Sequence, residues 1–128
     1  MNIGQLAKRS GLSSKQIRHY EEIGLIQEPM RTENGYRMYS NDDIHFLKFI
    51  KRSRELGFSL EVIKDLIGLW KNKSRSSREV KVLATKHLQE LELKLKNIQE
   101  MTQTLKHLLH NCHGDHRPDC PILENLES

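Results

Sequence analysis

The feature that most constrains the fold is a regular apolar pattern between residues 76 and 110, a stretch much longer than an average helix. Along it, side chains recur at alternating intervals of four and three residues, at Ala84, Leu88, Leu91, Leu95, Ile98, Thr102, Leu105 and Leu109. We call these eight positions the seam, and their spacing is typical of a coiled coil. One helix cannot bury the seam alone, and the chain contains no second seam of this length. The pattern therefore predicts a homodimer, with packing of the seam on the chain's own small domain as the alternative.

The composition fits a mainly helical protein that shares its core with a partner chain. The 128 residues are 36% hydrophobic, 5% aromatic and 30% charged, which leaves little material for a large single core. The charge is uneven: residues 1–75 hold 14 Lys and Arg against 9 Asp and Glu, whereas residues 76–128 hold 7 against 8. A basic N-terminal part indicates a polyanionic partner.

Capping and turn residues divide the first 75 residues into short elements. Short helices are predicted at residues 3–9 and 14–22, with Gly11 between them and Ser13-Ser14 as the cap of the second. Asn34-Gly35 predicts a two-residue hairpin turn with positive φ within residues 30–39. Two further helices are predicted, from Ser40 or Asn41 to about residue 56 and from Ser59 to residue 70. The predicted domains are thus 1–75, 76–110, and a C-terminal loop and helix at 111–128.

The first two helices have the pattern of a helix-turn-helix. Ala7 allows a close helix approach, Gly11 permits the tight turn, and Ile17 anchors the second helix, which leaves Lys15, Arg18 and His19 projecting outward. The hairpin that follows carries Arg31, Tyr36 and Arg37, a composition suited to a wing that grips phosphates beside the groove. The alternative is a hairpin that only caps the domain.

No apolar run approaches the ~20 residues that span a membrane, and the N-terminus lacks the pattern of a secretory signal. We therefore expect a cytoplasmic protein with no membrane partner, in which Cys112 and Cys120 stay reduced. The chain has no Gly-rich phosphate loop and no nucleophile beside an evident base, so an enzyme is not expected.

Four segments resemble the MerR family of transcription regulators: Ile3–Ala7, Ile17–Leu25, the hairpin Arg31–Tyr39, and Lys51–Gly57. The resemblance implies a winged helix-turn-helix, two linker helices and an antiparallel dimerisation helix. It also implies binding to a palindromic promoter and activation by DNA distortion, so that RNA polymerase can engage. The residues that match family DNA contacts are Lys15, Arg18, Tyr20, Arg31, Asn34, Tyr36, Arg37 and Arg54. His19 departs from the family, where relatives often carry an aromatic ring.

The two cysteines in the tail are the candidate effector site. Thiolates are soft ligands that favour Cu(I) and similar ions, and a site of two sulfurs alone suits a monovalent d¹⁰ ion better than Zn(II). Cys120 directly precedes Pro121, which predicts its sulfur at a helix N-terminus, where a thiolate is stabilised.

The tail resembles the copper-responsive branch of the family, which implies Cu(I), or Ag(I) or Au(I), as the effector. That resemblance also implies that Ser77 and Lys81 lie beside the metal ligands without binding the ion. Sensors of divalent ions carry a third cysteine at the position of Ser77, and Lys81 offsets the charge of the metal–dithiolate unit. A solvated helix lysine is the alternative at Lys81. Alternatives for the whole site are a mixed sulfur–nitrogen site for a divalent ion, built with His107, His110, His113 and His116, and a redox dithiol. For the whole protein, the alternative is a metal carrier or buffer that does not act on DNA.

Overall fold

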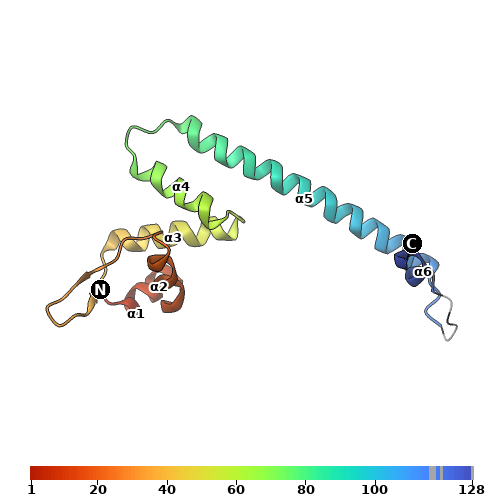
Figure 1. The fold of residues 1–128 in the computed structure, drawn as a ribbon, viewed down its shortest axis with the longest axis horizontal. Helices are drawn as coiled ribbons and strands as arrows, with labels where there is room; N and C mark the ends of the chain where they lie inside the picture. Colours follow the sequence, from red (N-terminus) through yellow and green to blue (C-terminus); the bar gives the residue numbers. More distant parts are fainter. Residues whose placement is uncertain (116–117, 119, 128) are drawn as a thin grey trace. The chain divides into compact units, whose positions relative to one another are not determined.

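The computed structural model describes residues 1–115, 118 and 120–127. Within these residues, six helices and a two-stranded sheet follow one another in the order α1, α2, β1, β2, α3, α4, α5, α6 (Figure 1). The chain divides into two compact units, Met1–Leu83 and Ala84–Ser128, so the first turns of α5 belong with the N-terminal unit. The predicted boundary at residue 75 lies in the loop before α5, and the predicted segments 76–110 and 111–128 lie mostly in the second unit.

The helix-turn-helix is formed by α1 (Ile3–Ser10) and α2 (Ser14–Glu22), as predicted. Each helix begins with a reciprocal capping box, Asn2 with Gln5 and Ser13 with Gln16, which satisfies backbone N–H groups that have no partner in a first turn. Gly11 ends α1 in the left-handed region, at φ 78°, and donates its N–H to the Ala7 carbonyl at 3.0 Å. This glycine cap sets the short turn between the two helices.

The hairpin pairs β1 (Met30–Arg31) with β2 (Arg37–Met38), but its turn differs from the prediction. Gly35 has a φ of 81°, whereas no non-glycine residue of the described chain has a positive φ, so Asn34 does not adopt the predicted conformation. Thr32 donates its N–H to the Tyr36 carbonyl, and the Gly35 N–H bonds back to the Thr32 carbonyl. These bonds indicate a three-residue loop closed by one left-handed glycine.

The core of the first unit forms where α3 (Asn41–Glu55) and α4 (Leu60–Lys71) meet the helix-turn-helix. Five of its side chains are fully buried, one or more from each of the four helices: Leu6, Ile17, Leu47, Ile50 and Ile63. Ser59 caps α4 by accepting the Val62 N–H, as the sequence predicted. Trp70, near the end of α4, packs against the rings of Phe46 and Phe49 on α3, with centroids 5.4 and 4.9 Å away.

The predicted long helix is α5 (Ser77–Asn111), 35 residues in one element. Its six large apolar seam side chains are exposed in the single chain, from 40% at Leu91 to 62% at Leu109. Within the described residues, no helix is long and apolar enough to cross a membrane. The second unit ends in α6 (Pro121–Glu127), and Leu108, outside the seam, is its one buried hydrophobic side chain among the described residues.

Candidate DNA interface and metal site

The candidate recognition helix α2 presents polar side chains outward from a buried face. Ile17 is fully buried, whereas Lys15, Arg18 and His19 are exposed as predicted. Tyr20 differs, because it is only 7% exposed and belongs to the hydrophobic core. It lies three residues after Ile17 and so shares its face of the helix. The ring of Tyr20 thus belongs to the core, and its DNA contact stays a prediction.

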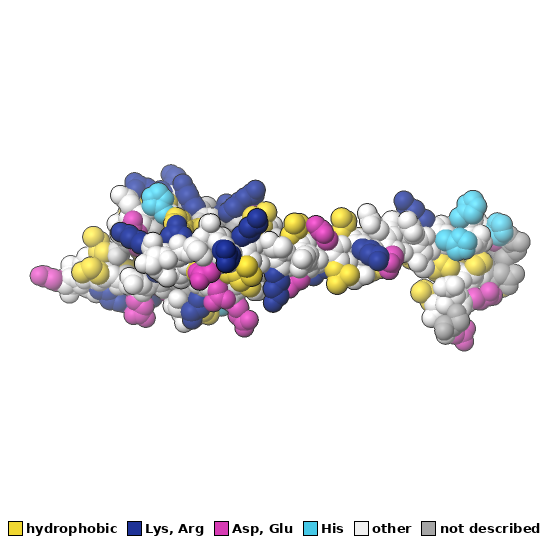
Figure 2. All heavy atoms as spheres, turned by 90° about the horizontal axis from the view of Figure 1, so that it is seen from above, with side chains coloured by type: hydrophobic (Ala, Val, Ile, Leu, Met, Phe, Trp, Pro, Cys, Tyr) yellow, Lys and Arg dark blue, Asp and Glu magenta, His cyan; other side chains and the backbone are white. Residues whose placement is uncertain are grey.

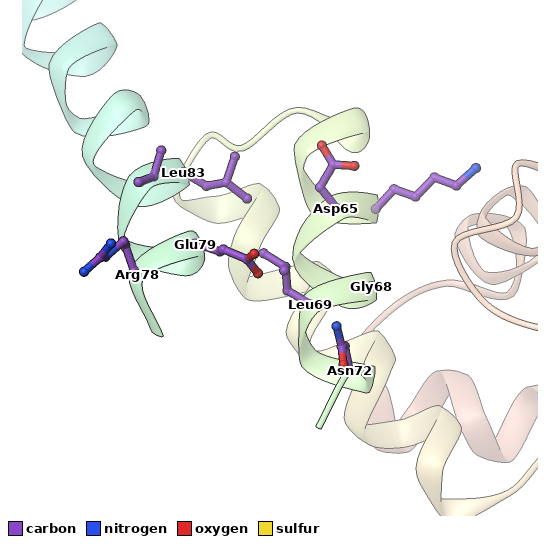
Figure 3. Close-up of a pocket in the computed structure, with 9 residues that line it drawn as sticks. Asp65, Gly68, Leu69, Asn72, Arg78, Glu79 and Leu83 are labelled. Atoms are coloured by element: carbon purple, nitrogen blue, oxygen red, sulfur yellow. The ribbon is translucent and has the colours of Figure 1, made fainter. Parts of the chain in front are cut away.

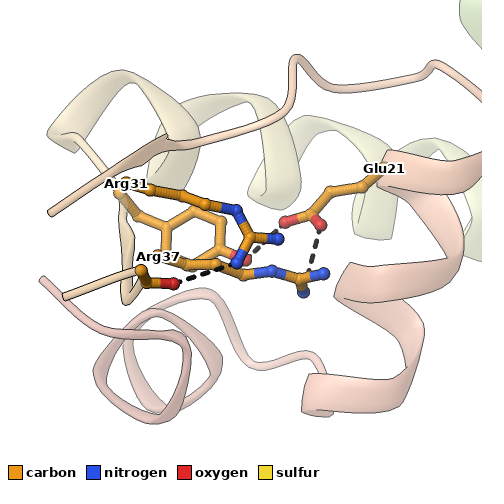
Figure 4. Close-up of polar contacts among 5 residues, drawn as sticks. Glu21, Arg31 and Arg37 are labelled. Carbon is orange, nitrogen blue, oxygen red and sulfur yellow. Dashed lines mark hydrogen bonds and ion pairs between the residues drawn. The ribbon is translucent and has the colours of Figure 1, made fainter. Parts of the chain in front are cut away.

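The wing is tied to α2 through a buried carboxylate (Figure 4). Glu21 contacts Arg37 through Oε2, with 3.3 Å between that oxygen and Nη1, while the Tyr39 hydroxyl donates a hydrogen bond to Oε1. Burial raises the pKa of Tyr39 to about 12, and the hydrogen bond to Glu21 adds to this increase against a smaller opposite effect of Arg37. The ion pair with Glu21 holds the Arg37 guanidinium beside α2.

The other candidate DNA contacts are exposed, and two are arginines held by backbone carbonyls. Arg31 donates from Nη1 to the Gly35 carbonyl at 2.9 Å, and Arg54 donates from Nη1 to the Phe58 carbonyl at 2.9 Å. Asn34 and Tyr36 lie exposed at the turn of the hairpin. Figure 2 shows Lys and Arg side chains gathered over one side of the first unit. Arg31 and Arg54 thus offer the charge and the ordered donors that phosphate contacts require.

The two cysteines face each other in the second unit. Their sulfur atoms are 3.9 Å apart and both residues are half-buried. The Leu123 N–H lowers the pKa of the Cys120 thiol, and the Ile122 N–H and the Cys112 thiol act in the same direction, whereas desolvation and Glu124 oppose them. One metal ion with metal–sulfur bonds of about 2.3 Å can reach two sulfurs up to about 4.6 Å apart, so the pair fits a shared ion.

Comparison with known proteins agrees with this combination of parts. The family model described as "MerR HTH family regulatory protein" matches residues 1–68, and the model described as "MerR, DNA binding" matches residues 44–108. The chain belongs to the MerR family. Its members are DNA-binding transcription regulators, not enzymes.

Relatives of this MerR-family chain match it along nearly its whole length. It is 57% identical over 126 residues to "Heavy metal-dependent transcription regulator 2" of Rhizobium meliloti (strain 1021), covering 98% of this chain and 86% of that protein. It is 42% identical over 126 residues to "HTH-type transcriptional regulator CueR" of Escherichia coli O6:H1, covering 98% and 93%. Among solved structures, PbrR691 of Ralstonia metallidurans CH34 in complex with lead(II) has a TM-score of 0.88 at 30% identity and covers 98% of both chains.

The histidines of this MerR-family chain do not gather around the sulfurs in the part of the tail that the structure describes. His107 lies with Nε2 3.3 Å from the Asn111 side-chain nitrogen, and His110 and His113 are exposed. His116 lies outside the described residues. Among the described residues, no group of three or more His, Cys, Asp and Glu side chains is placed to hold one ion. The described part of the site thus consists of the sulfur pair.

The structure adds two features that sequence reasoning missed. One is the Glu21 carboxylate, whose partners Arg37 and Tyr39 lie many residues later in the sequence. The other is a groove of about 810 Å³ between α4 and the first turns of α5 (Figure 3), where Glu79 points toward Leu69. The apolar spacing on α4 and α5 gave signals for the two helices but none for the groove, because the loop between them sets how they pack.

Proposed function

We propose that this chain is a homodimeric transcription regulator that binds a palindromic promoter and activates transcription when Cu(I), or Ag(I) or Au(I), binds Cys112 and Cys120. The observation that carries the metal assignment is the pair of half-buried sulfurs 3.9 Å apart. Two soft donors facing each other match the preference of monovalent ions of this group. The heavy-metal dependence in the name of the 57% identical relative supports a metal effector.

The proposed homodimer follows from the exposed seam. A row of leucines and isoleucines that is 40–62% exposed in the single chain must be covered, and the coiled-coil spacing predicts a second copy of α5 as the cover. Fully burying such a side chain from water contributes ~1.5–3 kcal/mol, and these start about half exposed, so each gains roughly half of that. Six on each of two chains still give enough to offset the cost of association. An antiparallel arrangement, as the family resemblance implies, places each helix beginning near the partner's helix end.

The proposed roles of Ser77 and Lys81 depend on this antiparallel dimer. Ser77 begins α5, Lys81 lies one turn later, and both are exposed. A helix of 35 residues is about 52 Å long at 1.5 Å per residue, and Cys112 follows its last residue. Ser77 and Lys81 therefore serve the cysteines of the partner chain, where the lysine charge offsets a negatively charged metal–dithiolate unit.

The proposed DNA surface combines α2, the wing and Arg54. Lys15, Arg18 and His19 enter the major groove, while Arg31, Asn34, Tyr36 and Arg37 contact the flanking backbone. We propose that metal binding favours a protein conformation that changes the bend and twist of the promoter, so that RNA polymerase engages it. The metal must bind the activating conformation more tightly than the resting one, because equal affinity would shift no population.

Transcription in vitro from a promoter with an extended spacer tests this proposal directly. The response is measured while Cu(I), Ag(I), Zn(II) and Hg(II) are titrated against wild type, Cys112→Ser and Cys120→Ser. We expect monovalent ions to activate wild type only, because a serine hydroxyl is a hard and poorly ionised replacement for a thiolate. Both variants should keep the wild-type affinity for the promoter, which separates sensing from DNA binding.

A divalent sensor is the second candidate, because the similar PbrR691 and MerR of Bacillus megaterium MB1 were solved with lead(II) and mercury(II). Changing His107, His110, His113 and His116 together to Asn separates the two candidates. A site of two sulfurs keeps its Cu(I) response in this variant, and X-ray absorption of the loaded protein finds sulfur without nitrogen. Nitrogen neighbours, together with a lost response, favour the mixed divalent site. A carrier that does not act on DNA is excluded if the chain binds its promoter.

A further inference from the structure

We propose that Glu21 is a positioning residue for DNA binding, whose buried carboxylate fixes the wing against α2 and orients the Arg37 guanidinium toward the DNA backbone. The proposal rests on the DNA surface proposed above. It assigns a DNA-binding role to an acidic residue, which by charge alone would oppose a polyanion.

The carboxylate of Glu21 is almost completely enclosed and both of its oxygens have partners. The side chain is 5% exposed, Oε1 accepts from the Tyr39 hydroxyl, and Oε2 pairs with Arg37 Nη1 at 3.3 Å. Both partners come from one short segment of the wing, whereas Glu21 comes from the last turn of α2. A wing displaced from α2 would leave a buried charge without partners, which is strongly unfavourable.

The ion pair with Glu21 orders the Arg37 side chain and leaves part of its guanidinium exposed. A guanidinium has five N–H donors, and the structure gives an ion pair to Nη1 while the side chain remains 32% exposed. Beside the donors that face Glu21 and Tyr39, the exposed part of the guanidinium can contact a phosphate. A long side chain that is already held in place loses less conformational entropy on binding than a mobile one. Glu21 thus favours the phosphate contact of Arg37 even though it carries a negative charge.

The neighbouring residue Glu22 supplies a matched control. It lies one position later in α2 but is exposed, so Glu22→Gln removes the same charge without touching the wing contacts. Glu21→Gln keeps the shape of the side chain and removes the charge that holds Arg37. If simple repulsion of DNA dominated, both substitutions would raise affinity. If Glu21 positions Arg37, only Glu21→Gln lowers it.

Fluorescence anisotropy with a labelled operator duplex, selected from a randomised library, tests the proposal in a double-mutant cycle. We expect Glu21→Gln to weaken binding about fivefold in the wild-type background and less than twofold in an Arg37→Ala background, as coupled neighbours do. Glu22→Gln should change affinity less than twofold or increase it. Circular dichroism gives the thermal unfolding transition of each variant, and all binding measurements are made below that temperature.

Several outcomes overturn the proposal. A loss of the same size in the Arg37→Ala background shows that Glu21 acts through the fold alone, and a gain like that of Glu22→Gln shows repulsion. Should Glu21→Gln fail to fold, Glu21→Asp draws the charge back by one methylene, and full affinity in that variant also contradicts the proposal. Arg37→Ala by itself tests the underlying function: unchanged binding and salt dependence would remove Arg37 from the DNA surface altogether.

Discussion

Replacing three glycines by alanine, one at a time, should give three different changes in the free energy of unfolding. Gly11 has a φ of 78°, and a Cβ there would lie 2.6 Å from Lys51 Nζ. A left-handed backbone costs an L residue ~1–2 kcal/mol, and the flexible end of Lys51 can move away with a small further loss. Gly11→Ala should therefore lower stability by about 1–2 kcal/mol per chain.

Substitutions at two other glycines measure the cost of the backbone conformation apart from the cost of a crowded Cβ. Gly24 has a φ of 79° with nothing within 4 Å of a Cβ, so Gly24→Ala should lose only the backbone part, about 1 kcal/mol. Gly68 lies inside α4 with open space around it, so Gly68→Ala should stabilise the chain by up to about 1 kcal/mol. Urea denaturation at one fixed protein concentration measures all three, since the stability of the proposed dimer would depend on concentration. A neutral Gly11→Ala, or a destabilising Gly68→Ala, would refute the reasoning.

Three further predictions concern single side chains. Arg18→Ala should lose ~1–3 kcal/mol of discrimination at one base pair, measured by anisotropy on operator variants, and uniform weakening across all sequences would contradict base readout. Leu95→Asp should give monomer or aggregate in sedimentation velocity, because a carboxylate is costly in an apolar interface, and an intact dimer would mean that the seam faces elsewhere. Because the Tyr39 pKa is raised from 10.0 to about 12 in the folded state, its contribution to stability is present below pH 10 and declines as the pH rises toward 12. In urea denaturation, Tyr39→Phe should lack that decline, and an identical decline in both proteins would contradict this assignment.

The helices were predictable because their signals are local. Ser13 and Ser59 cap helices at the predicted positions, since a hydroxyl one residue before a helix bonds an N–H within the same turn. The hairpin turn was only partly predictable. Asn34-Gly35 fits either a two-residue turn or a longer loop with one left-handed glycine, and the Thr32 hydroxyl, which accepts the Tyr36 N–H, favours the longer one.

The cysteine site in the tail was also only partly predictable from the sequence. Two cysteines with a glycine between them predict that the chain turns back, and Gly114 does adopt a φ of 63°. The distance between the sulfurs depends on more than this turn. It requires α6 to begin directly after Cys120, with the Glu124 N–H bonded to the Cys120 carbonyl, and Leu108 buried in the same unit. Spacing along the chain indicates which residues can meet, but packing determines how closely.

Charge and motif patterns did not single out Glu21, for a different reason. Glu21 and Glu22 are the same residue type in neighbouring positions, and a basic DNA-binding part with two adjacent carboxylates gives no reason to prefer either. Helical periodicity does separate them, because Glu21 lies four residues after the buried Ile17 and so turns inward, while Glu22 stays exposed. A carboxylate that turns inward requires partners, and the nearest basic strand supplies one in Arg37. The useful rule for a winged helix-turn-helix is therefore to ask which acidic residue falls on the buried face of the recognition helix, and then which wing residue neutralises it.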